Sequence, residues 1–206
     1  MMTYTQIRAA VKGFVLDSSD ELEADLDTLI RLGELKIYRE ADLRVFRRHS
    51  FTSLIPGDYY LKIPLDCLVV RDLRMTNGDY LENVPESFIR EYWPVPEVLG
   101  TPKYYSQWDH ARVLLAPTPS DGVQVEMTYT YQPPGLSVDV PTTWLSTFAE
   151  DLLLYSILVE TATYKQGMIP SGVDQQYRAN YDAALNRLVG QEQRNRYDEY
   201  KQRGNI

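Results

Sequence analysis

The pattern of apolar and polar residues divides the chain into two helical ends and a β-rich middle. Near both ends apolar residues recur every three or four positions, which is the period of a helix with one buried face. The buried stripe expected for the second helix comprises Leu22, Leu26, Leu29, Ile30 and Gly33. Proline follows the same division, because eleven of the twelve prolines lie between Pro56 and Pro141 and proline interrupts helix interiors.

The middle of the chain changes to an alternating pattern. Between Val123 and Gln132 every second residue is apolar, which predicts a strand with one buried and one solvated face, as in an antiparallel sheet. The dipeptide Asn77-Gly78 lies between two apolar runs and predicts a hairpin with a type I′ turn. Two more strands are expected at residues 104–108 and 112–116, and a short helix is expected at 85–92.

The helical period returns after Pro141. From Thr142 to Lys165 apolar residues cover most of a helix circumference, which predicts one helix of about 36 Å that is buried in a bundle or between subunits. A last apolar stripe stops at Gly190. Residues 191–206 contain four basic and three acidic residues and no such stripe. They form either a frayed terminus or a segment that becomes ordered on a partner.

Composition narrows the classes of function. A length of 206 residues is sufficient for one domain with an insertion. The net charge of −8 argues against a free-standing nucleic-acid binder, which needs clustered Lys and Arg. A single cysteine, Cys67, excludes an intrachain disulfide framework. We find neither a leader-like start nor an apolar run near the ~20 residues of a membrane span, so we expect a soluble protein made in a reducing compartment.

The sequence carries little evidence for enzymatic chemistry. It has no P-loop, no G-x-S-x-G, no H-E-x-x-H and no dinucleotide-binding glycine motif. We therefore expect no enzymatic activity, no cofactor and no metal site. One basic cluster offers a possible DNA-facing patch, although Glu40 and Asp42 interrupt it; the alternative is a solvated loop or an arginine contact to an acidic neighbouring subunit. Its members are Arg39, Arg44, Arg47, Arg48 and His49.

Several short motifs occur in a fixed order: Tyr80–Phe88, Thr101–Tyr105, Leu114–Pro119 and Tyr129–Trp144. Together they resemble the phage head-to-tail adaptor family and, more distantly, tail tubular protein A of short-tailed phages. The resemblance implies an α+β fold in which N- and C-terminal helices form a bundle, with a small inserted antiparallel β-sandwich and a C-terminal extension. The expected segments are 1–56 (N-terminal helices), 57–141 (β-sandwich with one short helix), 142–190 (C-terminal helices) and 191–206 (portal-docking tail).

The resemblance also implies a function. It predicts a structural virion protein that forms a ring, expected to be a dodecamer, between the portal and the tail nozzle or tail tube protein. Tail fibres are a further candidate partner, and no membrane contact is expected. The ring would enclose the channel of genome ejection at the virion neck, and DNA would pass without specific binding. The portal-docking residues would be Arg194, Arg196, Tyr197, Tyr200, Lys201 and Arg203.

Two other functions stay open at this point. A virion-associated hydrolase would need a pocket with perturbed carboxylates, for which Asp109 and Glu126 are candidates. A carbohydrate-binding module would instead present Trp93 or Trp108 on an exposed platform. Sixteen tyrosines against five phenylalanines favour a surface that becomes an interface, because tyrosine combines an apolar face with a hydroxyl.

Overall fold

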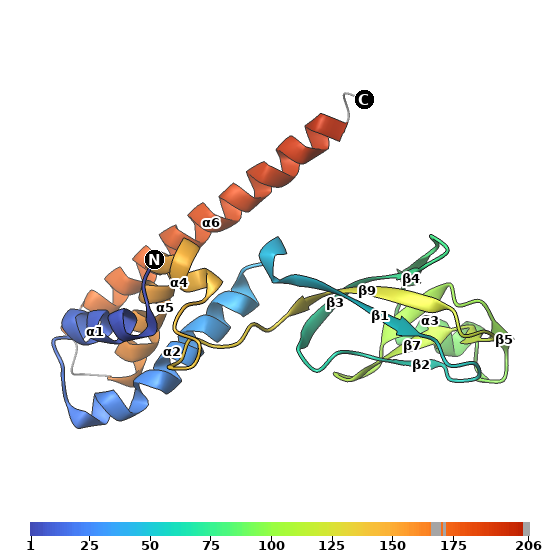
Figure 1. The fold of residues 1–206 in the computed structure, drawn as a ribbon, viewed down its shortest axis with the longest axis horizontal. Coiled ribbons are helices and arrows are strands. Elements are labelled where there is room, and N and C mark those ends of the chain that lie inside the picture. The colour runs from blue at the N-terminus through green and yellow to red at the C-terminus, as the bar shows by residue number, and fades with distance from the viewer. Residues whose placement is uncertain (166–169, 171, 204–206) are drawn as a thin grey trace. The chain divides into compact units, whose positions relative to one another are not determined.

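The computed structural model describes residues 1–165, 170 and 172–203, with side chains described up to Arg194. The chain forms two compact units, one built from residues 1–43 and 134–206 and the other from residues 44–133. The first unit is helical and the second is β-rich (Figure 1). Helices from both ends of the chain therefore pack together, the β region is inserted between them in the sequence, and the predicted α+β class is confirmed.

The described helices of the first unit surround a central helix, α5. They are α1 (Tyr4–Val15), α2 (Asp20–Glu40), α4 (Trp144–Phe148), α5 (Glu150–Tyr164) and α6 (Val173–Arg203). Contacts with α1, α2, α4 and α6 involve several faces of α5. Its buried residues are Leu152, Leu153, Ser156, Ile157, Leu158, Val159, Thr161 and Ala162. A helix apolar nearly all round needs such surroundings, because each of its faces must leave water.

The prediction of one unbroken helix over residues 142–165 is wrong. The chain breaks at Ala149, which has φ −139° and ψ 46° and separates α4 from α5. The backbone N–H of Met2 donates to the carbonyl oxygen of Ser146 at 2.8 Å. In a continuous helix that carbonyl would accept from the N–H of Glu150. A tertiary hydrogen bond from the start of the chain thus replaces a helical one.

Helices α2 and α5 approach closely at Gly33. A Cβ atom at this position would lie 2.8 Å from Cγ1 of Ile157 and 3.0 Å from its backbone nitrogen. The Ser156 hydroxyl donates to the Gly33 carbonyl oxygen at 2.8 Å. The predicted α2 stripe, which includes Gly33, is buried as expected, and the glycine allows the two backbones to come together.

The buried carboxylate of Glu34, on α2, binds the backbone of the segment that follows the β region. Both oxygens of Glu34 accept the backbone N–H of Leu136, at 3.1 and 3.0 Å, and Nη1 of Arg31 lies 3.6 Å from Oε2. Burial raises the pKa of Glu34 to about 7, against the lowering effects of the Leu136 N–H and of Arg31. Gly135 leaves room for this arrangement, since a Cβ there would lie 2.8 Å from Nη1 of Arg31.

In the inserted unit, which is described without a gap, seven strands form one curled sheet in the order β1-β9-β3-β4-β6-β7-β2. They are β1 (Arg47–Ser53), β2 (Tyr60–Lys62), β3 (Cys67–Met75), β4 (Tyr80–Asn83), β6 (Tyr104–Gln107), β7 (Arg112–Ala116) and β9 (Gln124–Tyr131). The short strands β5 (Leu99–Gly100) and β8 (Thr118–Pro119) pair separately, α3 spans Glu86–Tyr92, and a 3-10 turn, η1, spans Arg44–Phe46. The predicted strands and short helix near 85–92, 104–108, 112–116 and 123–132 are confirmed.

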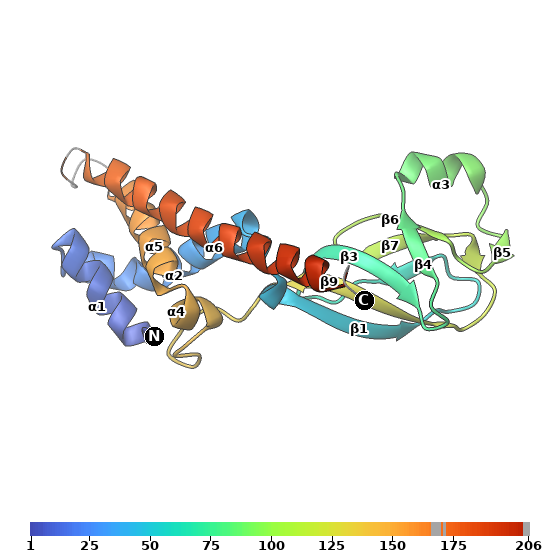
Figure 2. The same cartoon turned by 90° about the horizontal axis from the view of Figure 1, so that it is seen from above.

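The predicted antiparallel β-sandwich is wrong in two respects. Strand β4 pairs antiparallel with β3 but parallel with β6, so the sheet is mixed. Strand β4 also joins the two halves into one sheet, which curls around a shared core as Figure 2 shows from a second direction. The parallel pairing follows from the connection through α3, because parallel neighbours need a crossover instead of a tight turn. Residues from both halves fill the core, including Leu61, Leu73, Tyr105, Val113 and Met127.

The predicted β3–β4 hairpin is confirmed, but its turn differs from type I′. Gly78 has φ 105°, whereas Asn77 does not have a positive φ. The N–H of Met75 donates to the carbonyl oxygen of Asp79 at 2.8 Å, which leaves a loop of residues 76–78. A three-residue loop places only its last residue in the left-handed region, where glycine is favoured.

Candidate functional site

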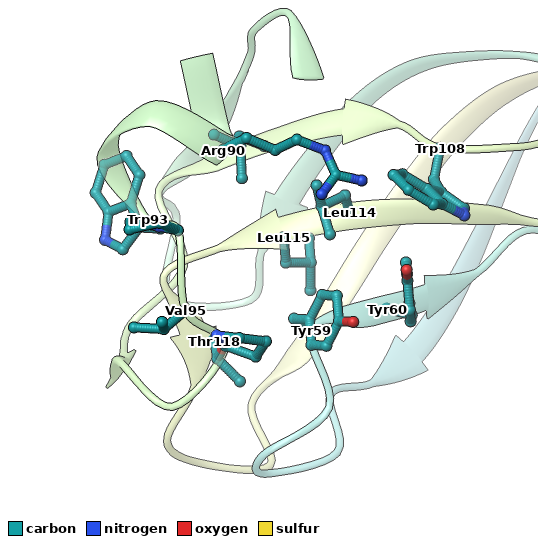
Figure 3. A pocket seen from close by; sticks show the side chains of 12 residues that line it. Tyr59, Tyr60, Arg90, Trp93, Val95, Trp108, Leu114, Leu115 and Thr118 are labelled. Carbon is teal, nitrogen blue, oxygen red and sulfur yellow. The ribbon is translucent and has the colours of Figure 1, made fainter. Parts of the chain in front are cut away.

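A small pocket lies on the inserted unit between the end of α3 and strands β2 and β7 (Figure 3). Its volume is about 100 Å³. The lining residues are Tyr59, Tyr60, Ile89, Arg90, Trp93, Pro94, Val95, Pro96, Trp108, Leu114, Leu115 and Thr118. Because a cavity of roughly 150 Å³ binds benzene, this pocket has room for one small ring or aliphatic side chain.

Backbone hydrogen bonds hold the tyrosine wall of the pocket. The N–H of Leu115 donates to the carbonyl oxygen of Tyr59 at 2.8 Å, and the N–H of Tyr60 donates to Oδ1 of Asp58 at 2.9 Å. The centroids of the two tyrosine rings are 4.3 Å apart. The ring of Tyr60 is in turn 5.8 Å from that of Trp108. Three aromatic side chains are thus placed side by side by the sheet.

The opposite wall forms where α3 ends. Trp93, with φ −128° and ψ 66°, is the C-cap, and its N–H donates to the carbonyl oxygen of Ile89 at 2.8 Å. The helix stops there because a residue before proline, here Pro94, is disfavoured in the helical region. The Trp93 ring packs 5.3 Å from Tyr104. This contact directs the exposed segment Pro94–Pro96 along the rim.

Two arginines stack on the aromatic wall. The guanidinium of Arg90 lies 4.9 Å from the ring centroid of Trp108, and that of Arg112 lies 5.1 Å from Tyr60. Figure 3 shows Arg90 reaching from α3 toward Trp108. Arg90 also pairs with Glu86 on the solvent side. Cation–π contacts of this kind restrain aromatic rings at a partly exposed site.

The polar groups around the pocket are mainly hydrogen-bond donors. None of the twelve described lining residues is Asp, Glu, Asn or Gln. A hydrogen bond with the hydroxyl of Tyr59 raises the pKa of Tyr60, so the Tyr60 phenol remains protonated at neutral pH. The pocket can therefore bind an apolar group flanked by acceptors, but its lining offers no carboxylate for general acid–base catalysis.

The carboxylates considered for a hydrolase do not line this pocket. Oδ1 of Asp109 accepts the N–H of Ala111 at 2.7 Å in the turn between β6 and β7. Oε1 of Glu126 lies 3.0 Å from Nδ1 of His49 across β1 and β9. Both carboxylates therefore have local structural partners, and the structure does not bring them together with the aromatic pocket.

The other candidates for chemistry also occupy structural positions. Trp93 and Trp108 are half-buried in the pocket wall, not exposed on a platform. Burial raises the pKa of the Cys67 thiol to about 11, assisted by the charge of Asp66, so the thiol is protonated at neutral pH. Among the described residues, no three His, Cys, Asp or Glu side chains gather as metal ligands. None of the helices in that part of the chain is both long and apolar enough to span a membrane.

The basic cluster is divided between the two units. Arg39 belongs to α2, whereas Arg48 and His49 lie on β1. Nη1 of Arg48 is 3.0 Å from Oδ2 of Asp66, and its guanidinium lies 3.6 Å from the ring centroid of Tyr131. Arg48 thus already has partners in its own unit, which weakens the case for a phosphate-binding patch.

The C-terminal helix α6 continues past the point where its apolar stripe ends. Tyr177, Tyr181 and Ala184 are buried, whereas beyond Gly190 the helix extends past the other helices of its unit (Figures 1 and 2). Arg194 is exposed, and its Nε donates to the carbonyl oxygen of Gly190 at 3.3 Å. The other predicted docking residues also lie on α6, but their side chains are outside the described part: Arg196, Tyr197, Tyr200, Lys201 and Arg203.

These features define an α+β protein with a helical unit from both chain ends and an inserted curled sheet. The sequence model of the family described as SU10 adaptor protein matches residues 2–204. The chain therefore belongs to the SU10 adaptor protein family, a phage head-to-tail adaptor family, which confirms the resemblance seen in its motifs. Membership implies a structural role between the head and tail of a phage particle. No curated protein matches the chain.

The sequence pattern indicates two residues of the pocket but not the pocket itself. It points to Trp93 and Trp108 as an exposed platform, and it does not indicate Tyr59, Tyr60 or Arg90 as site residues. A signal was present in the adjacent tyrosines, because tyrosine is enriched at interfaces, and in the run Trp93–Pro96, because proline ends a helix and begins a turn. No local pattern in the sequence indicates that the end of α3 lies near β2 and β7.

Proposed function

We propose that this chain is one subunit of a ring, a dodecamer, that lies beneath the portal and encloses the DNA exit channel at the virion neck. The observation that carries the proposal is the family match over nearly the whole chain, residues 2–204. The partners are the portal on one side and the tail nozzle or tail tube protein on the other, with tail fibres as a further candidate. In this role the protein is structural and has no enzymatic activity.

The charge of the chain supports a channel through which DNA slides. A net charge of −8 means that few phosphates can be neutralised, so little affinity arises from counterion release. Arg48 and His49, in the basic cluster, lie beside Asp66 and Glu126 of the same subunit. A lumen of this composition would let DNA pass without specific binding.

The segment 191–206 is proposed as the portal-docking element. Beyond Gly190 the sequence has no apolar stripe to pack against its own unit, so contacts with a partner would supply the binding energy of this segment. Arginine forms forked hydrogen bonds with carboxylates, and tyrosine fills pockets at interfaces. Residues 1–43 and 134–190 would form the ring-building bundle, and residues 44–133 would be the inserted part, so the boundaries expected at 56/57 and 141/142 shift because β1 belongs to the sheet.

Truncation after Gly190 tests this proposal together with a mass measurement of the complex. Native mass spectrometry of the intact protein with portal should give a ring with twelve copies of this chain. The truncated protein should keep its melting temperature, because the deleted segment has no buried apolar stripe, and should no longer co-sediment with portal. A full-length variant with residues 191–206 scrambled is the matched control for length and charge. If the truncated or scrambled protein binds portal at full strength, the docking surface lies elsewhere.

A further inference from the structure

We propose that the pocket beside α3 binds a proline-containing, extended segment of a partner protein. Nothing in the adaptor role assigns a ligand to this pocket. The inference is carried by the size of the cavity, the aromatic rings and the hydrogen-bond donors around it. It does not depend on ring formation or on docking to the portal, and it can be tested on the isolated full-length chain.

The shape of the pocket matches a compact ring presented by an extended chain. Its volume of about 100 Å³ takes one prolyl or similar side chain. Tyr59, Tyr60 and Trp108 line one side, with ring centroids 4.3 and 5.8 Å apart along the row. Polyproline II segments bind aromatic-lined grooves in this way, and their preformed conformation lowers the entropic cost of ordering.

The polar groups favour proline over other ligands of similar size. Proline has a carbonyl acceptor but no N–H, so a proline-rich segment needs donors and few acceptors. The lining supplies side-chain donors in Arg90 and in the phenol groups, and it contains no carboxylate or carboxamide side chain. A sugar would bring several hydroxyl donors that need acceptors, and the side chains of the lining offer only hydroxyl oxygens for them. A carbohydrate therefore fits these walls less well.

The rim of the pocket offers additional apolar surface to a bound segment. The last residue of α3 and the segment after it expose large apolar side chains to solvent, namely Tyr92 (61%), Val95 (50%), Val98 (45%) and Leu99 (58%). Within the inserted unit this end of the sheet lies opposite the end where β1 begins and β9 finishes (Figures 1 and 2). The connections to the helical unit therefore leave the unit at the far end from the rim. An extended segment anchored in the pocket would cover part of this apolar rim.

Nuclear magnetic resonance on the ¹⁵N-labelled full-length protein tests the proposal with decaproline as the probe. The three tryptophans are three reporters: Trp93 and Trp108 line the pocket, whereas Trp144 lies in the helical unit. We expect saturable shifts of the first two indole signals and no shift of the third. A glycine–serine decapeptide, which lacks the preformed conformation and the rings, should leave all three unchanged.

Two substitutions locate the binding site. Tyr60→Ala removes the central ring and should lower the affinity for decaproline at least about tenfold, the loss typical of a buried aromatic anchor. Tyr80→Ala is the matched control, because Tyr80 is 66% exposed and does not line this pocket. If Tyr60→Ala does not fold, Val95→Arg places a bulky charge at the exposed rim without touching the core and should weaken binding similarly.

Several results would overturn the proposal. One is the absence of saturable indole shifts at millimolar decaproline. Another is a response confined to Trp144, or binding that survives both Tyr60→Ala and Val95→Arg. Binding of oligosaccharides by the pocket, together with no response to decaproline, would assign the site to carbohydrate instead.

Discussion

Substitution of Gly33 by alanine tests how the helical unit is held together. In most helix interiors this change is favourable, since alanine exceeds glycine in helix propensity by about 1 kcal/mol. At Gly33, however, the new Cβ would lie 2.8 Å from Cγ1 of Ile157 and 3.0 Å from its backbone nitrogen. The side chain can rotate, but the backbone nitrogen can move only if α5 moves away from α2.

The gain in helix propensity and the steric contact with Ile157 change the stability in opposite directions, and the steric contact should be the larger effect. Inserting a methyl group into a well-packed contact costs about 1–3 kcal/mol. The carbonyl oxygen of Gly33 also accepts the hydroxyl of Ser156 at 2.8 Å, a bond that separation of the helices would lengthen; its loss would add about 1 kcal/mol. After the propensity gain, we expect Gly33→Ala to lower the free energy of unfolding by roughly 1–3 kcal/mol.

Gly13→Ala is the matched control within the same unit. Gly13 lies inside α1, and no neighbouring atom would come within 4 Å of its Cβ. This variant should be more stable than the parent by roughly 0.5–1 kcal/mol. Urea titration followed by circular dichroism at 222 nm measures both variants under the same conditions.

A second substitution tests whether the contact with Ile157 causes the loss of stability in Gly33→Ala. Combining Gly33→Ala with Ile157→Ala removes the Cγ1 atom that the new methyl group meets. The double variant should therefore be less destabilised than the sum of the two single variants, with a coupling of about 1 kcal/mol. If Gly33→Ala is as stable as Gly13→Ala, the close approach of α2 and α5 does not limit this position and the reasoning is refuted.

Three further predictions concern pH, a buried ion pair and DNA. Because the folded pKa of Glu34 is about 7 against an ordinary 4.5, the parent should lose roughly 3 kcal/mol of stability between pH 4.5 and 7 through this group. Glu34→Gln, which retains an acceptor for the Leu136 N–H, should reduce the change of the free energy of unfolding with pH, measured by urea titrations at several pH values. An unchanged pH dependence would contradict this prediction. Lys165 is 8% exposed and pairs with Asp17. Lys165→Met should therefore destabilise the protein less than Asp17→Ala, because Asp17→Ala leaves an ammonium buried without its partner. If the urea midpoint of Lys165→Met is instead the lower one, the unpaired ammonium does not cause the loss of stability. The free protein should not retain duplex DNA at micromolar concentration and physiological salt in a gel-shift assay, and retention would reveal a cationic surface that the net charge hides.

Local periodicity was sufficient to predict a helix or strand wherever that element is determined by residues close together in the sequence. The stripe from Leu22 to Gly33 indicated α2, and the alternation from Val123 to Gln132 indicated β9 with Val125, Met127 and Tyr129 buried. These patterns are informative because a helix or strand must turn its apolar residues to one side whatever it packs against. The family motifs extended this reading to the adaptor class, which the match over residues 2–204 confirms.

Tertiary structure decided the features that depend on residues far apart in the sequence. Residues 142–165 form two helices instead of one, and the N–H of Met2 donates to the carbonyl oxygen of Ser146 where the helix would otherwise continue. The sheet is mixed and curled, and not a sandwich, because β4 pairs with both β3 and β6, and the second pairing is set by the crossover through α3. The same crossover brings Trp93 opposite Tyr60 and so creates the pocket. A sequence specifies such contacts only through the packing of the whole unit, because the residues that meet share no local pattern.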